Sequence, residues 1–351
     1  MKRISRYVLI VTMIMVVVIS GCSSKTPPKA ALQAAILKTT GAESYKLSMT
    51  VQIDELDIPV ATSVNNFPIG SFAGVLKDAT IKIDAIYSKK SVRTDMNVEV
   101  VLPGMMDMKI AFPMIMKDKL LYIKLPEIPL IQLPESVVGK YIVIDADKLA
   151  AKQGTKTGIS VAEQQKLIQE LSEASLKHFD EEKYFNNVKV ADAGLPEGVK
   201  VDQVVKFVID EGNYAGTAEL LANKVLPELL DVVLSNETAQ RALQVDKAKL
   251  EKLRADWDTN KTELLNVLQN DFKIHVLELM GAIKDKYLVH QNGKINVEAT
   301  NKESGLTKKI GFTFAGQYSE IDKDLTFNQE IPTDALPWDQ VKQLLAAPSA
   351  L

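Results

Sequence analysis

The side chains best suited to chemistry in this sequence are three histidines, His178, His275 and His290, and a single cysteine, Cys22. Imidazole acts as a general acid or base and as a metal ligand, and a thiolate acts as a nucleophile. The histidines show no H-E-x-x-H pattern and no pair at the spacing of helical metal ligands. The glycine patterns of nucleotide-binding loops and the G-x-S-x-G turn are also absent from the sequence. We therefore expect no catalytic residue, no metal site and no cofactor. A hydrolase that uses paired carboxylates is the least favoured alternative.

Cys22 ends an N-terminal segment with three parts. Residues 1–6 carry three cations, residues 7–19 form an apolar run that only Thr12 interrupts, and Ile19-Ser20-Gly21-Cys22 follows. An apolar run of 13 residues is shorter than the roughly 20 that a membrane-spanning helix needs. It has the length of the apolar region of a secretory signal. The segment resembles the signal peptide and lipobox of bacterial lipoproteins, with an isoleucine where leucine is commoner.

This resemblance implies a lipid-anchored protein. Residues 1–21 would be a signal peptide that is cut between Gly21 and Cys22, and the Cys22 sulfur would carry a diacylglyceryl group. Two acyl chains are enough for stable anchoring, since each buried methylene contributes about 0.8 kcal/mol. We expect the protein on the extracytoplasmic face of the cell membrane, with the membrane as its partner through this lipid. An uncleaved membrane anchor with an incidental cysteine is the alternative.

The composition is that of a folded protein. Of 351 residues, 46% are hydrophobic and 25% are charged, which excludes a disordered chain. The formal charge of −3 excludes a strongly basic nucleic-acid-binding protein, so we expect no nucleic-acid partner. A single cysteine also rules out an intramolecular disulfide. Residues 22–40 are expected to form a tether and a short helix.

Hydrophobic periodicity divides the remaining chain, 41–351, into three parts. A period of two predicts strands within 45–145, a longer period predicts a helical middle over 160–270, and the strand period returns over 272–330. Asn292-Gly293 predicts a hairpin turn, and Leu325 and Phe327 open the last strand candidate. We interpret 41–351 as a single α+β domain with one large antiparallel sheet and helices on its apolar face. Two subdomains remain the alternative.

The order of these elements behind a lipobox also resembles the LolA/LppX-like superfamily of bacterial surface lipoproteins. Glu43-Ser44-Tyr45-Lys46-Leu47 opens the long meander in this chain. The resemblance implies a strongly curved, half-barrel-like sheet with helices packed on its concave face, after the signal helix. It also implies an apolar cavity that receives acyl chains.

A cluster of methionines is the candidate lining of such a cavity. Methionine is flexible and polarizable, so it suits surfaces that accept irregular apolar partners. The candidate lining residues lie close together in the sequence: Met105, Met106, Met108, Phe112, Met114 and Met116. An ordinary core strand is the alternative interpretation, and the more favoured one.

The functional hypothesis is a non-enzymatic lipoprotein that binds an apolar or lipid ligand in a cavity between sheet and helices. The second hypothesis is an envelope scaffold with a filled core and no ligand, which presents the helices within 217–257 to another envelope protein.

Overall fold

The structure is a computed structural model that describes residues 26–58, 69–104, 108–128, 133–145, 147–148, 161–243, 246–302 and 304–346. The signal segment expected over residues 1–21 lies outside this range, as do Gly21 and Cys22. None of the described helices has the length and hydrophobicity of a membrane-spanning segment.

A single large sheet organises the fold. It has 12 strands in the order β12-β6-β5-β4-β3-β2-β1-β11-β10-β9-β8-β7, and only the β12–β6 pair is parallel. The strands are β1 (Ser44–Asp57), β2 (Thr80–Ser88), β3 (Arg93–Leu102), β4 (Met108–Lys117), β5 (Leu120–Lys124), β6 (Tyr141–Asp145), β7 (Phe185–Val188), β8 (Gln203–Asp210), β9 (Phe272–Lys284), β10 (Tyr287–Thr300), β11 (Thr307–Ser319) and β12 (Leu336–Pro337). The α+β fold class with a large curved antiparallel sheet is therefore confirmed.

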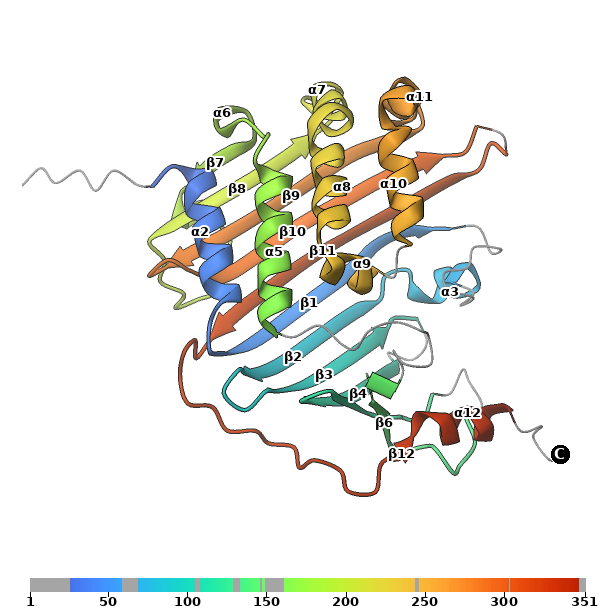
Figure 1. The fold of residues 1–351 in the computed structure, drawn as a ribbon. Helices are drawn as coiled ribbons and strands as arrows, with labels where there is room; N and C mark the ends of the chain where they lie inside the picture. The colour runs from blue at the N-terminus through green and yellow to red at the C-terminus, as the bar shows by residue number, and fades with distance from the viewer. Residues whose placement is uncertain are drawn as a thin grey trace, which may run out of the picture.

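Helices cover one face of this sheet, with α2, α5, α8 and α10 lying side by side across it (Figure 1). The helices are α2 (Pro28–Thr40), α3 (Ile69–Leu76), α5 (Val161–Leu176), α6 (Glu181–Tyr184), α7 (Tyr214–Leu220), α8 (Leu226–Ser235), α9 (Glu237–Leu243), α10 (Lys247–Ala255), α11 (Trp257–Asn270) and α12 (Trp338–Ala346). A short π-helix, η2 (Leu221–Val225), connects α7 to α8 just before Pro227. Proline lacks the N–H that a regular helix needs, which accounts for the irregular turn at this point.

Alternate side chains of each strand point to opposite faces of the sheet. Met49 of β1 lies opposite Ile83 of β2, which lies opposite Val98 of β3 and then Phe112 of β4. Paired residues point to the same side of a sheet, so the four side chains form one apolar row. Cross-strand pairing places this row on the same face as Gly281, against which helix α2 packs. The helices thus cover the apolar, concave face, and the polar face is convex.

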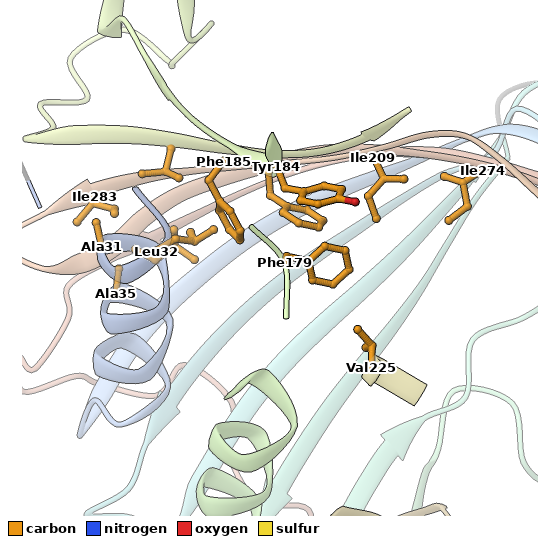
Figure 2. Close-up of a cluster of buried hydrophobic side chains, with 13 residues drawn as sticks. Ala31, Leu32, Ala35, Phe179, Tyr184, Phe185, Ile209, Val225, Ile274 and Ile283 are labelled. Carbon is orange, nitrogen blue, oxygen red and sulfur yellow. The ribbon is translucent and has the colours of Figure 1, made fainter. Parts of the chain in front are cut away.

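The main core lies where α2 meets strands β7–β9 (Figure 2). Phe179, Tyr184 and Phe207 form edge-to-face and stacked pairs, with ring centroids 4.9–6.2 Å apart. Gly281 allows the close approach of α2, since a Cβ there would lie 2.7 Å from Cδ1 of Leu32. A larger residue would push the helix off the sheet.

The prediction of a hairpin turn at Asn292-Gly293 is wrong. Both residues lie within β10, and the turn that joins β9 to β10 consists of Asp285 and Lys286, with φ of 50° and 65°. Positive φ at both positions is typical of a type I′ turn. The backbone N–H of Asp285 donates to the Asp202 carboxylate at 2.7 Å, so a tertiary contact stabilises a turn that lacks glycine.

The strand candidate that Leu325 and Phe327 were expected to open is also wrong. The strands predicted over 272–330 end at Ser319, and residues 320–335 contain no strand. We call residues 320–335 the C-terminal strap. The strap runs along the sheet from the end of β11 to β12 at the far edge (Figure 1). Side-chain contacts with the strands hold it, so its alternating apolar residues need no ladder of backbone hydrogen bonds.

Candidate apolar binding site

The predicted methionine lining is divided by the fold. Met105 and Met106 lie outside the described residues. Met108 and Phe112 pack in a small core cluster with Ile110, beneath α3. Two further candidates lie on the same face of β4: Met114, which is half-buried, and Met116, which is 49% exposed. Their role as ligand lining stays a prediction.

An apolar pocket lies instead within the helical layer, between α8, α10 and α11. Its volume is about 880 Å³, within the range of about 300–1,000 Å³ that is common for small-molecule sites. Nine of its lining side chains are apolar and three are polar. The lining comprises Leu226, Leu229, Leu230, Val233, Leu250, Leu253, Trp257, Asn260, Lys261, Glu263, Leu264 and Val267.

The sequence builds this pocket from helical periodicity. On α8 the lining residues recur at positions i, i+3, i+4 and i+7, from Leu226 to Val233. Arg254 of α10 pairs with Asp231 of α8 at 2.6 Å and connects the two helices. The indole N–H of Trp257 donates to the backbone carbonyl of Ala222 at 3.2 Å. With its polar atom satisfied there, the indole ring serves the pocket as an apolar wall.

The opening of the pocket exposes apolar surface to water. Leu253 is 48% exposed and Val267 is 40% exposed, among the largest exposures of apolar side chains in the described residues. The polar lining residues Asn260, Lys261 and Glu263 all belong to α11. Apolar walls with a few polar groups along one side can bind an apolar ligand and fix the direction of its polar end.

The sequence interpretation missed this pocket, although the signal was present. The leucines of α8 and α10 indicated apolar helix faces, which the scaffold hypothesis assigned to a partner protein. Whether such faces meet tightly or leave space depends on the distances and angles between helices. Those distances and angles are not encoded in the periodicity of one segment.

The histidines occupy three different environments. His275 lies between two carboxylates, with Nδ1 2.9 Å from Glu211 and Nε2 3.3 Å from Glu298. The hydrogen bond to Glu211, and then the one to Glu298, raise the pKa of His275. His290 is only 5% exposed, and burial lowers its pKa. His178 contacts Glu228. The described residues contain no group of three or more acidic, histidine or cysteine side chains placed to hold a metal ion.

Comparisons with known proteins identify no family. No protein-family model matches the sequence, and no curated protein matches it. Among solved structures, a dehydratase–cyclase domain of ambruticin biosynthesis is 11% identical, with 84% of this chain and 81% of that chain covered and a TM-score of 0.11. A conserved hypothetical protein of Mycobacterium tuberculosis with a double hotdog fold is 11% identical, with coverages of 84% and 82% and a TM-score of 0.13. TM-scores of this size do not indicate a common fold.

Proposed function

We propose that this chain is a non-catalytic, lipid-anchored protein of the extracytoplasmic membrane face that binds an apolar ligand carrying acyl chains. The observation that carries the binding proposal is the pocket of about 880 Å³ with nine apolar lining residues. The sequence Ile19-Ser20-Gly21-Cys22 supports the anchor. Binding and anchoring are separate parts of the proposal, and each has its own test.

Desolvation supplies the binding energy. Each methylene moved from water into an apolar pocket contributes about 0.8 kcal/mol, so roughly ten buried methylenes contribute about 8 kcal/mol before the cost of association. A charged group would lose its hydration among the leucines of α8 and α10. The ligand therefore places its acyl part between these helices and its polar end near Asn260, Lys261 and Glu263 of α11.

Tryptophan fluorescence tests the binding site directly. The chain has two tryptophans, and Trp257 lines the pocket. In the Trp338→Phe variant of the full chain, held in phospholipid nanodiscs, Trp257 is the remaining fluorophore. Dibromostearate should quench it in a saturable manner, because bromine atoms quench only at short range. Trp257→Phe, which keeps Trp338, should show no saturable quenching.

A matched pair of charge insertions tests the lining. Leu253→Asp places a carboxylate in the pocket at a position that is 48% exposed, so the fold tolerates it. Ala255→Asp places the same charge on the same helix, at an exposed residue outside the lining. We expect at least tenfold weaker binding for the first variant and unchanged binding for the second. Equal binding by both, or no saturable quenching of Trp257, would refute the pocket as the ligand site.

Metabolic labelling tests the anchor. Cells that express the unaltered chain should incorporate labelled palmitate into it, and Cys22→Ser should abolish the label because the sulfur that accepts the lipid is missing. Label that persists in the serine variant contradicts the proposed attachment site. An unaltered chain that takes up no label contradicts the anchor itself.

A further inference from the structure

A second recess lies on the convex face of the sheet, beside the C-terminal strap and away from the helices. Its volume is about 410 Å³. Strands β1, β2 and β3 form its floor, and Asn328 and Gln329 of the strap form a wall. The lining includes the polar residues Lys46, Ser48, Asp84, Asn97, Asn328 and Gln329.

Strand register creates a polar row on this floor. Ser48 lies opposite Asp84, and Asp84 lies opposite Asn97, so the three side chains stand next to one another across β1, β2 and β3. Lys46 is two residues before Ser48 and lies on the same face. These residues alternate with the apolar row of Met49, so they point away from the helices.

The strap wall is held rigidly. Arg93 pairs with Asp95, with Nε and Oδ1 2.6 Å apart, and it also donates to the backbone carbonyl of Gln329. The hydroxyl of Tyr141 donates to Oε1 of Gln329 at 3.2 Å. The Arg93 guanidinium lies 4.4 Å from the centroid of the Phe327 ring. A recess whose wall is fixed in this way loses little conformational freedom when a ligand binds.

Five polar side chains of the recess have no protein partner among the described residues. The side chains of Lys46, Ser48, Asp84, Asn97 and Asn328 make no hydrogen bond or ion pair with another residue in the part of the chain that the structure describes.

Two pairs of opposite charge elsewhere on the same face do meet across strands. Lys82 lies 3.5 Å from Glu99, and Lys206 lies 3.3 Å from Glu278. The lysine and the aspartate of the recess face one space and are not paired with each other or with another described residue.

We propose that this recess binds a neutral, polyhydroxylated ligand, a carbohydrate. Its unpaired groups include donors, on Lys46, Asn97 and Asn328, and acceptors, on Asp84 and the amide oxygens. Sugar hydroxyls both donate and accept, so they satisfy such a mixture.

Charge points to the same ligand class. Lys46 balances Asp84, and Arg93 balances Asp95, so the recess has no net charge. An anionic ligand would meet the unpaired carboxylate of Asp84, and a cationic ligand would meet Lys46. A neutral ligand avoids both repulsions.

Saturation-transfer NMR on the full chain in nanodiscs tests the proposal, with maltose and N,N′-diacetylchitobiose as neutral probes. Glucuronic acid, glucosamine and glutamine serve as anionic, cationic and zwitterionic comparators. We expect saturation transfer to at least one neutral disaccharide and at least fivefold weaker transfer to each comparator.

Point variants connect the signal to the recess. Asp84→Ala and Asn97→Ala should each reduce binding of the disaccharide at least tenfold. Thr50→Ala, at an exposed position of β1 on the same face but outside the lining, should leave it unchanged. The Tm of all three variants should match that of the unaltered chain, because the removed side chains have no protein partners.

Three outcomes overturn the proposal: no transfer to either disaccharide, transfer that survives both recess variants, or a charged or zwitterionic comparator that binds more tightly than the neutral sugars. Trp257 lies in the other site, so its quenching by dibromostearate is independent of these results.

Discussion

Substitution of Gly293 by alanine distinguishes two reasons for the glycine in Asn292-Gly293: the backbone conformation of a tight turn, or the lack of space for a side chain. In a tight turn, glycine is needed because φ is positive. In this structure Gly293 lies inside β10, and its φ is outside the positive region. The reason for glycine is space: a Cβ would lie 2.5 Å from the backbone oxygen of Glu278 and 2.6 Å from Cε1 of Phe314.

The expected cost follows from these two contacts. Overpacking of a well-packed site costs about 1–3 kcal/mol, and the upper end applies because the Glu278 oxygen belongs to the backbone and cannot turn away. We therefore expect Gly293→Ala to lose about 3 kcal/mol of unfolding free energy. With an unfolding entropy of about 2.1 cal/mol/K per residue, the Tm falls by about 5 °C. Thermal unfolding followed by circular dichroism measures the shift.

Two further variants make the test decisive. Phe314→Leu removes the ring, so Gly293→Ala should cost less in that background, with the remainder due to the Glu278 oxygen. Gly74→Ala is the control with the opposite expected effect. This exposed glycine of α3 has no atom within 4 Å of the place that a Cβ would take. Because alanine favours the helix over glycine, the variant should gain about 1 kcal/mol of unfolding free energy. If Gly293→Ala costs nothing, close packing is not the reason for the glycine. If it costs the same with and without the Phe314 ring, the ring is not part of the reason and only the Glu278 oxygen is.

Three further predictions concern stability. Burial lowers the pKa of His290, so the unfolded state gains a proton before the folded state does. The contribution of His290 to stability should therefore fall as the pH drops below about 6.5, while the raised pKa of His275 acts in the opposite direction. In urea titrations His290→Asn should lose less stability on acidification than the unaltered chain, and identical pH dependence of the two would exclude this role of His290. Asp95 is 4% exposed and paired with Arg93, so Asp95→Asn leaves a largely buried arginine without its counter-charge and should lower the free energy of unfolding by about 3–5 kcal/mol. A loss below about 1 kcal/mol in denaturant unfolding would mean that water solvates the arginine. Leu32→Ala should cost about 3 kcal/mol in denaturant unfolding, because Leu32 packs against Gly281; a neutral result would show that α2 is not part of the cooperative core.

Much of the fold could be predicted from the sequence, because most of the strands have one solvent-exposed face and therefore alternate polar and apolar residues. The alternation from Tyr45 to Ile53 predicted β1, and the turns and alternation that follow predicted the meander to Asp145. Local periodicity is informative here because apolar and polar side chains separate onto opposite faces.

Elements that depend on distant contacts could not be predicted. Strand β7 has four residues, and it exists because Phe185 pairs with Phe207 at the edge of the sheet. The turn at Asp285 depends on Asp202, far away in the chain. The candidate binding sites have the same limitation. The polar row of Ser48, Asp84 and Asn97 exists only because three strands align in one register, and no single segment reveals it.

The pairing of β1 with β11 has a consequence for the order in which the chain can fold. One edge of β1 finds β2 soon after synthesis, but its other edge, from Lys46 onward, waits for residues near Ser319. Until then, any sheet that the first six strands form has an open edge at β1. Such species fold slowly and aggregate readily. A chain that emerges N-terminus first therefore carries an unpaired edge of β1 until the residues near Ser319 are available.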